Sequence, residues 1–178
     1  MLPTMVSCSA STLFGGPELD VPYKSTRREV VALMLEMGEV KAGDTVIDLG
    51  TGDGRILIAA AKERGATGLG VDLDPVLIRK ARNAAQDAGV ADRVRFDAAD
   101  LFDTDLRSAD VVTMYLLPEV NLRLRPRLFE QLKPGTRVVS HAFDMGDWKP
   151  EAKRRAGGAT VYMWRIPERP ASTAQSYR

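Results

Sequence analysis

Residues 48–55 read Asp48-Leu49-Gly50-Thr51-Gly52-Asp53-Gly54-Arg55 and join a predicted strand, 45–49, to a predicted helix, 55–64. Glycines in such a turn let the backbone approach a ligand closely, and the helix N-terminus points its amides there. The next predicted strand ends in an acid, Asp72, 18 residues after Gly54, which suits the hydroxyls of a ribose. The pattern predicts a ligand-binding turn, although a tight turn without a ligand gives the same glycines.

Carboxylates flank the glycines of this turn. Asp48 and Asp53 would each repel a nearby pyrophosphate by about 1–4 kcal/mol, depending on the local dielectric. A dinucleotide fingerprint also needs a third small residue where this chain has Arg55. The same carboxylates suit a ligand with an ammonium group and a second cationic centre. S-adenosylmethionine carries both, together with a ribose, so the residues favour it over a nicotinamide dinucleotide, with S-adenosylhomocysteine as product.

A third acid, Asp100, follows the third predicted strand. Its carboxylate can accept the amino hydrogens of an adenine, while Leu101 or Phe102 packs on the ring. The alternative is that Asp100 only caps a short helix and Leu101 belongs to the core. Because open α/β folds bind ligands at the carboxyl edge of the sheet, acids at successive strand ends favour the adenine interpretation.

The remaining sequence alternates between strand and helix patterns. Strands are expected at 45–49, 67–72, 94–96, 110–115 and 136–141, and helices at 26–37, 55–64, 75–88 and 121–132. Either Ser25 or Thr26 is expected to cap the first helix. The turn signal Gly157-Gly158 before 159–165 predicts a terminal hairpin. This alternation predicts an α/β, doubly wound Rossmann-like sheet, mostly parallel, with an antiparallel C-terminal hairpin.

The length of 178 residues fits one domain. We expect it at residues 21–167, between a flexible leader at 1–20 and a disordered tail at 168–178. Hydrophobic residues make up 44% and charged residues 28%, which argues against a disordered or fibrous chain. The sequence has no run of about 18 apolar residues, so it predicts no membrane-spanning helix.

Charge and the scarcity of two residue types exclude several functions. With 25 Lys+Arg against 24 Asp+Glu, the net charge of +1 does not suggest a nucleic-acid partner. The single cysteine, Cys8, cannot form an internal disulfide, so a reducing, cytoplasmic compartment is expected. Cys8 and the single histidine, His141, cannot supply a zinc site built from several such ligands, and no metal is expected. The counts do not indicate an oligomeric state.

These motifs resemble those of the class I S-adenosylmethionine-dependent methyltransferases. Gly50–Gly54 stands at the glycine motif of that superfamily, Val71-Asp72-Leu73-Asp74-Pro75 at its ribose motif and Asp100-Leu101 at its adenine motif. Together with the residues themselves, the resemblance implies a set of cofactor-binding residues. They are Asp48, Gly50, Thr51, Gly52, Asp53, Gly54, Asp72, Leu73, Asp100, Leu101, Tyr115, Tyr23 and Thr26.

A closer resemblance is to the small lysine N-methyltransferases of the ATP synthase c subunit and the adenine nucleotide translocase, with their bacterial relatives. It is carried by Val21-Pro22-Tyr23, by Asp48 through Lys62, and by Phe143 through Trp148-Lys149-Pro150. It implies methyl transfer to a lysine amine of a protein. This chain departs from the family at Lys24-Ser25-Thr26-Arg27, where the family tends to have prolines, and it is not expected to carry the membrane segment of the eukaryotic members. The departures concern the substrate rather than the chemistry.

The acceptor is expected beyond the fourth predicted strand, at Tyr115-Leu116-Leu117-Pro118. Methyltransferases that act on the exocyclic amines of bases resemble one another in an Asn/Asp-Pro-Pro-Tyr/Phe motif there. Its first position falls on Tyr115, so the proton-accepting amide or carboxylate is missing. This argues against a nucleic-acid amine as the acceptor.

Four residues are candidates for the acceptor site: Tyr115, Glu119, Asn121 and His141. Tyr115 is expected to act as a ring wall or a hydroxyl acceptor, or else to cap the sheet. His141 is a possible general base, or else a hydrogen-bonded structural residue. Trp148 either lines the substrate channel or anchors the terminal hairpin. The competing functions are a small-molecule O- or N-methyltransferase and a non-catalytic S-adenosylmethionine-binding partner subunit.

Overall fold

The computed structural model describes residues 25–168 of the chain. The predicted leader, Tyr23 and the predicted tail from residue 169 onward lie outside the described residues. The helices found among the described residues are too short or too polar to cross a membrane.

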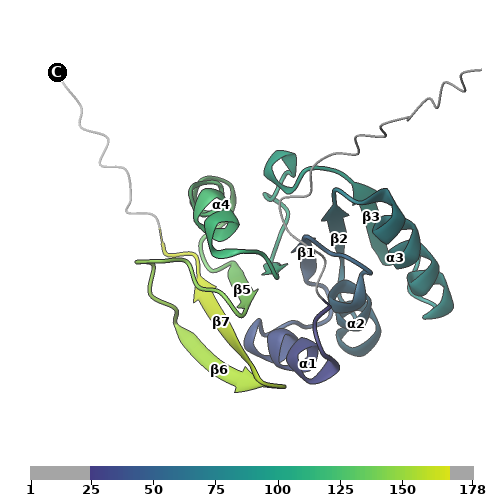
Figure 1. Ribbon diagram of the computed structural model, residues 1–178, viewed down its shortest axis with the longest axis horizontal. Helices are drawn as coiled ribbons and strands as arrows, with labels where there is room; N and C mark the ends of the chain where they lie inside the picture. The colour runs from purple at the N-terminus through teal and green to yellow at the C-terminus, as the bar shows by residue number, and fades with distance from the viewer. Residues whose placement is uncertain (1–24, 169–178) are drawn as a thin grey trace, which may run out of the picture.

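Seven strands form one sheet in the order β3-β2-β1-β4-β5-β7-β6 (Figure 1). They are β1 (Thr45–Leu49), β2 (Thr67–Asp72), β3 (Val94–Ala98), β4 (Val111–Met114), β5 (Arg137–His141), β6 (Ala152–Ala156) and β7 (Ala159–Arg165). β1 to β5 pair in parallel, and β7 pairs antiparallel with both β5 and β6. The predicted doubly wound, mostly parallel sheet with an antiparallel C-terminal strand is confirmed.

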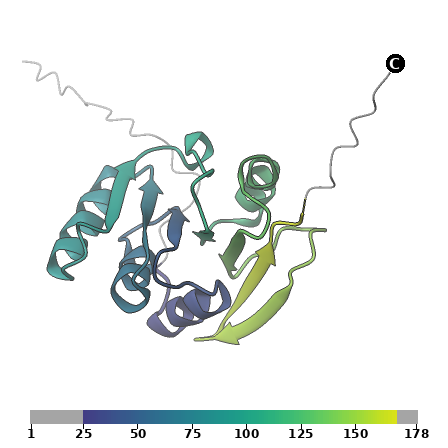
Figure 2. The ribbon, with the colours of Figure 1, turned by 180° about the vertical axis from the view of Figure 1, so that it is seen from behind.

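The helices cover the two faces of the sheet unequally. They are α1 (Arg28–Met37), α2 (Arg55–Arg64), α3 (Pro75–Asp87) and α4 (Pro118–Gln131), with a short 3-10 helix, η1 (Leu101–Asp103). α1, α2 and α3 lie on one face, and α4 and η1 lie on the other (Figures 1 and 2). The face shared by α4 and η1 therefore has less helical cover than the opposite face.

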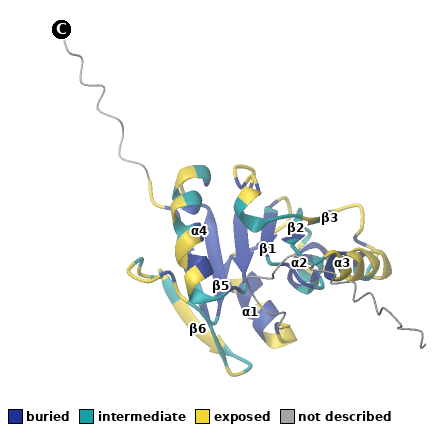
Figure 3. Cartoon of the chain, turned by 45° about the horizontal axis from the view of Figure 1, so that its top comes forward, coloured by how far each residue is buried: buried dark blue, intermediate teal, exposed yellow. Residues whose placement is uncertain are grey.

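Strand alternation divides the core into two apolar clusters. Val46 of β1 faces the cluster of α1, α2 and α3, whereas its neighbour Ile47 faces the cluster of α4. Successive side chains on a strand point to opposite faces, so each buried strand contributes to both clusters. The central strands are buried and the edge strand β6 is largely exposed (Figure 3). The sheet centre is therefore the rigid part from which the loops at its carboxyl edge project.

The predicted C-terminal hairpin is confirmed, with Gly157 and Gly158 as its turn at φ of +54° and +79°. Two consecutive positive φ values favour glycine and suit a two-residue hairpin. No bounds for the first strand of this hairpin, β6, followed from the sequence. β6 pairs antiparallel with β7, so only β7 runs against the other strands. Basic residues on β6 suit an edge strand, because charge there discourages pairing with another chain.

Two predicted helix starts are wrong. α1 begins at Arg28 with Arg27 as its N-cap and no side-chain cap, and the hydroxyl of Thr26 instead lies 3.0 Å from Nδ1 of His141. A partner 115 residues away is invisible to local pattern. α4 begins at Pro118 rather than at residue 121, because proline is well suited to a first helical turn.

Candidate functional site

The glycine turn is closed against the end of β2. Gly50 and Gly52 adopt positive φ values of +73° and +57°, which side chains rarely tolerate. The amides of Gly50 and Thr51 both donate to the carbonyl oxygen of Val71, at 3.0 and 2.9 Å. The turn therefore lies directly over the carboxyl edge of the sheet, as its sequence predicts.

Asp72, the last residue of β2, lies against this turn. Its Oδ2 accepts a hydrogen bond from the amide of Gly52 at 2.9 Å, and its Oδ1 accepts one from the amide of Asp74 at 3.0 Å. Each carboxylate oxygen can accept further donors. Asp72 and the following Leu73 are both partly exposed. The carboxylate is thus fixed in position while it can still accept ribose hydroxyls, and the ribose-binding role stays a prediction.

Asp48 is held inside β1 rather than at the edge. Its Oδ2 and Oδ1 accept hydrogen bonds from the hydroxyls of Thr51 (2.7 Å) and Thr113 (2.6 Å). Gly70 on β2 makes room for this arrangement, because a Cβ there would lie 2.6 Å from Oγ1 of Thr51. The pKa of Asp48 is raised to about 6: burial is the largest cause, the two hydroxyls oppose the rise, and the nearby carboxylates add to it.

The carboxylates that raise the pKa of Asp48 are those of Asp72 and Asp53. Negative charge is therefore concentrated beneath the turn, although no metal-binding group of three or more His, Cys, Asp or Glu residues occurs among the described residues. Such a surplus favours a bound cation and disfavours a pyrophosphate. The chemistry of these residues fits the sulfonium and ammonium of the expected cofactor.

We expect Asp48 to make folding stability depend on pH. Because its pKa is about 6 in the folded chain and about 3.8 in the unfolded chain, the folded state binds the proton more tightly. Asp48 therefore contributes to the free energy of unfolding below about pH 4, and this contribution is lost as the pH rises through about 6. The full difference is on the order of 3 kcal/mol.

Urea unfolding of the wild type and of Asp48→Asn between pH 4 and pH 7 measures this effect. The variant should gain stability relative to the wild type as the pH rises through this range, and the difference should be constant above it. A difference that does not change with pH would contradict the assignment.

Asp53 and Arg55 form an ion pair at the base of α2. Nε of Arg55 lies 2.9 Å from Oδ1 of Asp53, and Nη2 lies 2.5 Å from Oδ2. Nη1 of Arg55 donates to the carbonyl oxygen of Thr26 at 2.8 Å. Arg55 therefore partly neutralises Asp53 and ties the segment before α1 to the glycine turn. The contact of Arg55 with Thr26 joins residues 29 positions apart, so no local pattern predicts it.

Asp100 caps η1. Its Oδ1 accepts a hydrogen bond from the amide of Phe102 at 2.8 Å, as in the capping alternative. Leu101 and Phe102 are partly buried and pack against the core cluster of α4, which also agrees with that alternative. The guanidinium of Arg123 lies 4.2 Å from the centre of the Phe102 ring. A cap of this kind leaves acceptor capacity on Asp100, and its adenine-binding role stays a prediction.

Three rings gather where β4 and β5 end. The ring of Tyr115 lies 3.8 Å from that of His141 and 6.4 Å from that of Phe143, measured between ring centres. Tyr115 and Phe143 are partly exposed, and their planes are inclined by 25°. His141 is buried and its Nδ1 contacts the hydroxyl of Thr26. The structure thus brings two of the predicted acceptor-site residues together and adds Phe143.

A tight turn after β5 places Phe143. Its amide donates to the carbonyl oxygen of His141 at 2.9 Å, and the intervening Ala142 has a φ of +70°. A residue other than glycine in this region is strained, and such strain is often kept at functional sites. Ser140 Oγ also donates to the carbonyl oxygen of Phe143 at 2.6 Å. The position of Phe143 beside Tyr115 is therefore strongly determined by the surrounding structure.

The other two predicted acceptor-site residues lie near the start of α4. Asn121 is fully buried, and its Nδ2 donates to the carbonyl oxygens of Phe143 (3.4 Å) and Asp144 (3.2 Å). It holds the loop after β5 from below, rather than facing an acceptor in solvent. Glu119 is exposed in the first turn of α4. Glu119 is therefore accessible to solvent, whereas Asn121 contacts the loop that carries Phe143.

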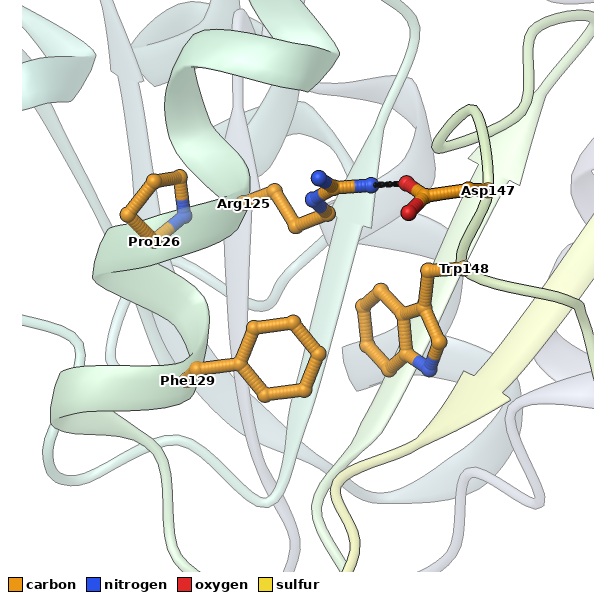
Figure 4. Close-up of a pocket in the computed structure, with 5 residues that line it drawn as sticks. All are labelled: Arg125, Pro126, Phe129, Asp147 and Trp148. Atoms are coloured by element: carbon orange, nitrogen blue, oxygen red, sulfur yellow. Dashed lines mark hydrogen bonds and ion pairs between the residues drawn. The ribbon is translucent and has the colours of Figure 1, made fainter.

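Trp148 anchors the hairpin, one of its two predicted roles. Its carbonyl oxygen accepts a hydrogen bond from Nε1 of Trp164 at 2.7 Å, and the two rings lie 5.6 Å apart. Its ring also contacts Phe129 of α4 at 4.5 Å (Figure 4). Trp148 thus lies on the face of the sheet that carries α4.

Comparison with known proteins identifies the family. The model of the ANTKMT methyltransferase domain matches residues 48–152. A protein-lysine N-methyltransferase of Saccharolobus islandicus is 43% identical over 83% of this chain and 95% of its own length. The adenine nucleotide translocase lysine N-methyltransferase of Mus musculus is 34% identical over 82% of this chain and 62% of its own length. The chain thus spans less than two thirds of the mouse protein.

A solved structure gives the same fold. An RNA methyltransferase from Salinibacter ruber, crystallised with S-adenosyl-L-homocysteine, is 54% identical, with a TM-score of 0.81 over 84% of this chain and 97% of its own. The relatives thus differ in the acceptors that their names give, but all are methyltransferases. The chain belongs to the ANTKMT methyltransferase domain family and is an S-adenosylmethionine-dependent methyltransferase.

Proposed function

We propose that this methyltransferase transfers its methyl group to a lysine amine of a protein. The observation that carries the proposal is the ring group of Tyr115, His141 and Phe143 at the ends of β4 and β5. An aromatic surface suits an alkyl amine and its methylated ammonium product. The names of the archaeal and mouse relatives support the same acceptor.

The turn and the strand ends would hold the cofactor. In this proposal Asp72 binds the ribose, Asp100 and Leu101 bind the adenine, and the acids beneath the turn favour the cationic end. When bound, S-adenosylmethionine supplies a methyl group that is open to in-line attack by a nucleophile. The protein then has to align the acceptor with the methyl group and exclude water, because correct positioning of the reactants lowers the barrier of such a displacement.

The lysine must lose its proton before it can attack. With a reference pKa near 10.4, about one lysine in a thousand is neutral at pH 7.4, which corresponds to roughly 4 kcal/mol. In this proposal Glu119, which is exposed in the first turn of α4, attracts the charged amine. Tyr115 and Phe143 would then remove water from it, and desolvation favours the neutral form. His141 orients Tyr115 through ring contact in this scheme, and direct proton transfer to it is the alternative.

Methylation assays with purified chain and labelled S-adenosylmethionine test the proposal. One reaction contains nucleic-acid-free protein extract, a second contains total RNA and a third contains a small-molecule extract. We expect label in protein, recovered as methyl-lysine by mass spectrometry. Label in RNA would favour the activity named for the Salinibacter structure. Label in small molecules would favour a small-molecule O- or N-methyltransferase. Cofactor binding without transfer to any of them would indicate a non-catalytic partner subunit.

Variants of Tyr115 separate its two proposed roles. Because loss of a positioning contact commonly costs one to two orders of magnitude, Tyr115→Ala should lower kcat/KM about 10–100-fold. Tyr115→Phe keeps the ring and should stay within about threefold of the wild type. Equal losses in both variants would instead assign the effect to the hydroxyl. Calorimetric titration with S-adenosylhomocysteine shows whether either variant also changes cofactor affinity.

We also place this reaction in the cytoplasm. The single cysteine is what supports a reducing compartment.

A further inference from the structure

A surface groove lies between α4 and the loop that joins β5 to β6, with a volume of about 350 Å³ (Figure 4). It is lined by Arg125, Pro126 and Phe129 of α4 and by Asp147 and Trp148 of the loop. Among the described residues no helix lies between β5 and β6, so this part of the sheet face is covered only by loop side chains. The groove therefore offers apolar surface outside the cofactor and acceptor sites.

One wall of the groove is aromatic. The rings of Phe129 and Trp148 lie 4.5 Å apart at an angle of 48°, and both residues are partly exposed. Trp148 is fixed from behind by its contacts with Trp164. The rings therefore present a preformed surface on which a bulky apolar side chain can pack at little conformational cost.

The groove also contains a positively charged side chain, that of Arg125. Nη1 of Arg125 donates to the carbonyl oxygen of Met145 at 2.9 Å and pairs with Asp147. The Arg125 side chain is 29% exposed, whereas that of Asp147 is 89% exposed. Asp147 thus reaches the guanidinium from the solvent side. A carboxylate from another molecule can take its place, because such an exposed pair is weakly held.

The groove and the acceptor site are joined by the same two elements. α4 begins beside Tyr115, and at about 1.5 Å per residue Arg125 and Phe129 lie about 10 and 16 Å along it. The loop carries Phe143 at one end and Trp148 at the other, and Asn121 and Arg125 hold its carbonyl oxygens. An extended peptide covers about 3.3 Å per residue, so about three to five residues span the distance.

We propose that this groove docks the protein substrate, by binding a bulky apolar side chain followed by a carboxylate about three to five residues from the target lysine. The apolar side chain packs on Phe129 and Trp148, and the carboxylate replaces Asp147 on Arg125. The inference rests on the proposed lysine methylation, since it assigns the substrate of that reaction a second contact.

Fluorescent 12-residue peptides provide a direct test. Each contains the pair Phe-Glu, Phe-Lys or Ser-Glu and, four residues after this pair, one lysine, so that the carboxylate lies nearer the lysine than the apolar side chain does, as Arg125 lies nearer the acceptor site than Phe129. Binding to the full chain is followed by anisotropy. We expect the Phe-Glu peptide to bind at least several-fold more tightly than the other two. Asp147→Asn removes the competing carboxylate, so it should tighten binding of this peptide about three- to tenfold. Arg125→Gln should weaken binding by a similar factor.

The matched control is Asp105→Asn, which breaks the exposed pair between Asp105 and Arg107 away from the groove. It should leave binding unchanged. A purely structural role for the Arg125–Asp147 pair predicts no gain from Asp147→Asn, and that result would overturn the docking site. Equal binding of the Phe-Glu and Phe-Lys peptides would also overturn it.

Other occupants give different results. If a 12-nucleotide RNA competes with the peptide, the groove binds RNA. If the chain self-associates in sedimentation and Arg125→Gln abolishes this, the groove binds a second copy of the chain. Either result would overturn the proposal. Mass spectrometry of the same peptides after incubation with S-adenosylmethionine separates the two proposals. If the extent of lysine methylation is the same with and without the Phe-Glu pair and in both groove variants, only the docking site is overturned. Absence of lysine methylation overturns the proposed function, while the expected order of peptide affinities would still establish a peptide-binding groove.

Discussion

Asp72→Ala should weaken binding of S-adenosylhomocysteine about a hundredfold or more. The carboxylate of Asp72 is fixed by the amides of Gly52 and Asp74, and each of its oxygens can accept a further hydrogen bond. Hydrogen bonds to a charged group contribute about 1.5–3 kcal/mol each, so the loss of two is worth at least a factor of 100. The substitution also releases the amide of Gly52, which loosens the turn. Isothermal titration of the purified variant measures the effect.

Asp74→Ala is the matched control. Asp74 is also an aspartate that accepts a backbone hydrogen bond, from the amide of Val76 at 2.7 Å, and it caps α3. Losing that cap should cost about 1 kcal/mol of stability. Affinity for S-adenosylhomocysteine should change by no more than about threefold. Equal losses of affinity in the two variants would show that Asp72 acts only through general loosening of the segment, and unchanged affinity in Asp72→Ala would remove it from the site.

Gly54→Ala should lower the free energy of unfolding by about 2–5 kcal/mol. A Cβ at this position would lie 2.7 Å from Cζ of Phe96 and 2.9 Å from Cβ of Ala81. The φ of +79° would cost a further 1–2 kcal/mol for any residue with a side chain. Overpacking of this kind typically costs 1–3 kcal/mol. The third glycine of the turn therefore serves close packing of α2 and α3 against β3, and urea unfolding followed by circular dichroism measures its contribution.

Gly89→Ala separates the two costs. Gly89 has a similar φ of +71°, but a Cβ there would meet nothing within 4 Å. It should therefore cost only the backbone term, about 1–2 kcal/mol. The difference between the two variants is the packing contribution at Gly54. If both variants lose the same stability, the close contact with Phe96 is not what requires glycine in the turn.

The glycine turn and the alternation of strands and helices could be predicted because their causes are local. Glycine at positions of positive φ, apolar runs of strand length and Pro75 at the start of α3 each act over a few residues. The position of Asp72 followed from the same reasoning, since the end of a parallel strand must lie at the carboxyl edge of the sheet. The hairpin turn at Gly157-Gly158 was likewise visible in the sequence.

Local reasoning was less successful where a helix boundary depended on distant partners. Thr26 reads as a helix cap, but its hydroxyl contacts His141 and its carbonyl oxygen accepts from Arg55. Once these bonds form, the chain cannot also place Thr26 at the N-cap of α1. The bounds of the short strand β6 could not be predicted for a related reason: its basic, exposed residues have no apolar alternation and form a strand by pairing with β7.

The sequence by itself thus determined the sheet, the turn at Gly50–Gly54 and the acids around it, because spacing along the chain carries that information. Only the tertiary structure decided what those acids and their neighbours do. It buried Asp48 beneath two threonine hydroxyls, paired Asp53 with Arg55, and directed Asn121 to the loop that holds Phe143. Burial and pairing depend on packing between segments far apart in the chain, and no local pattern of residues contains them.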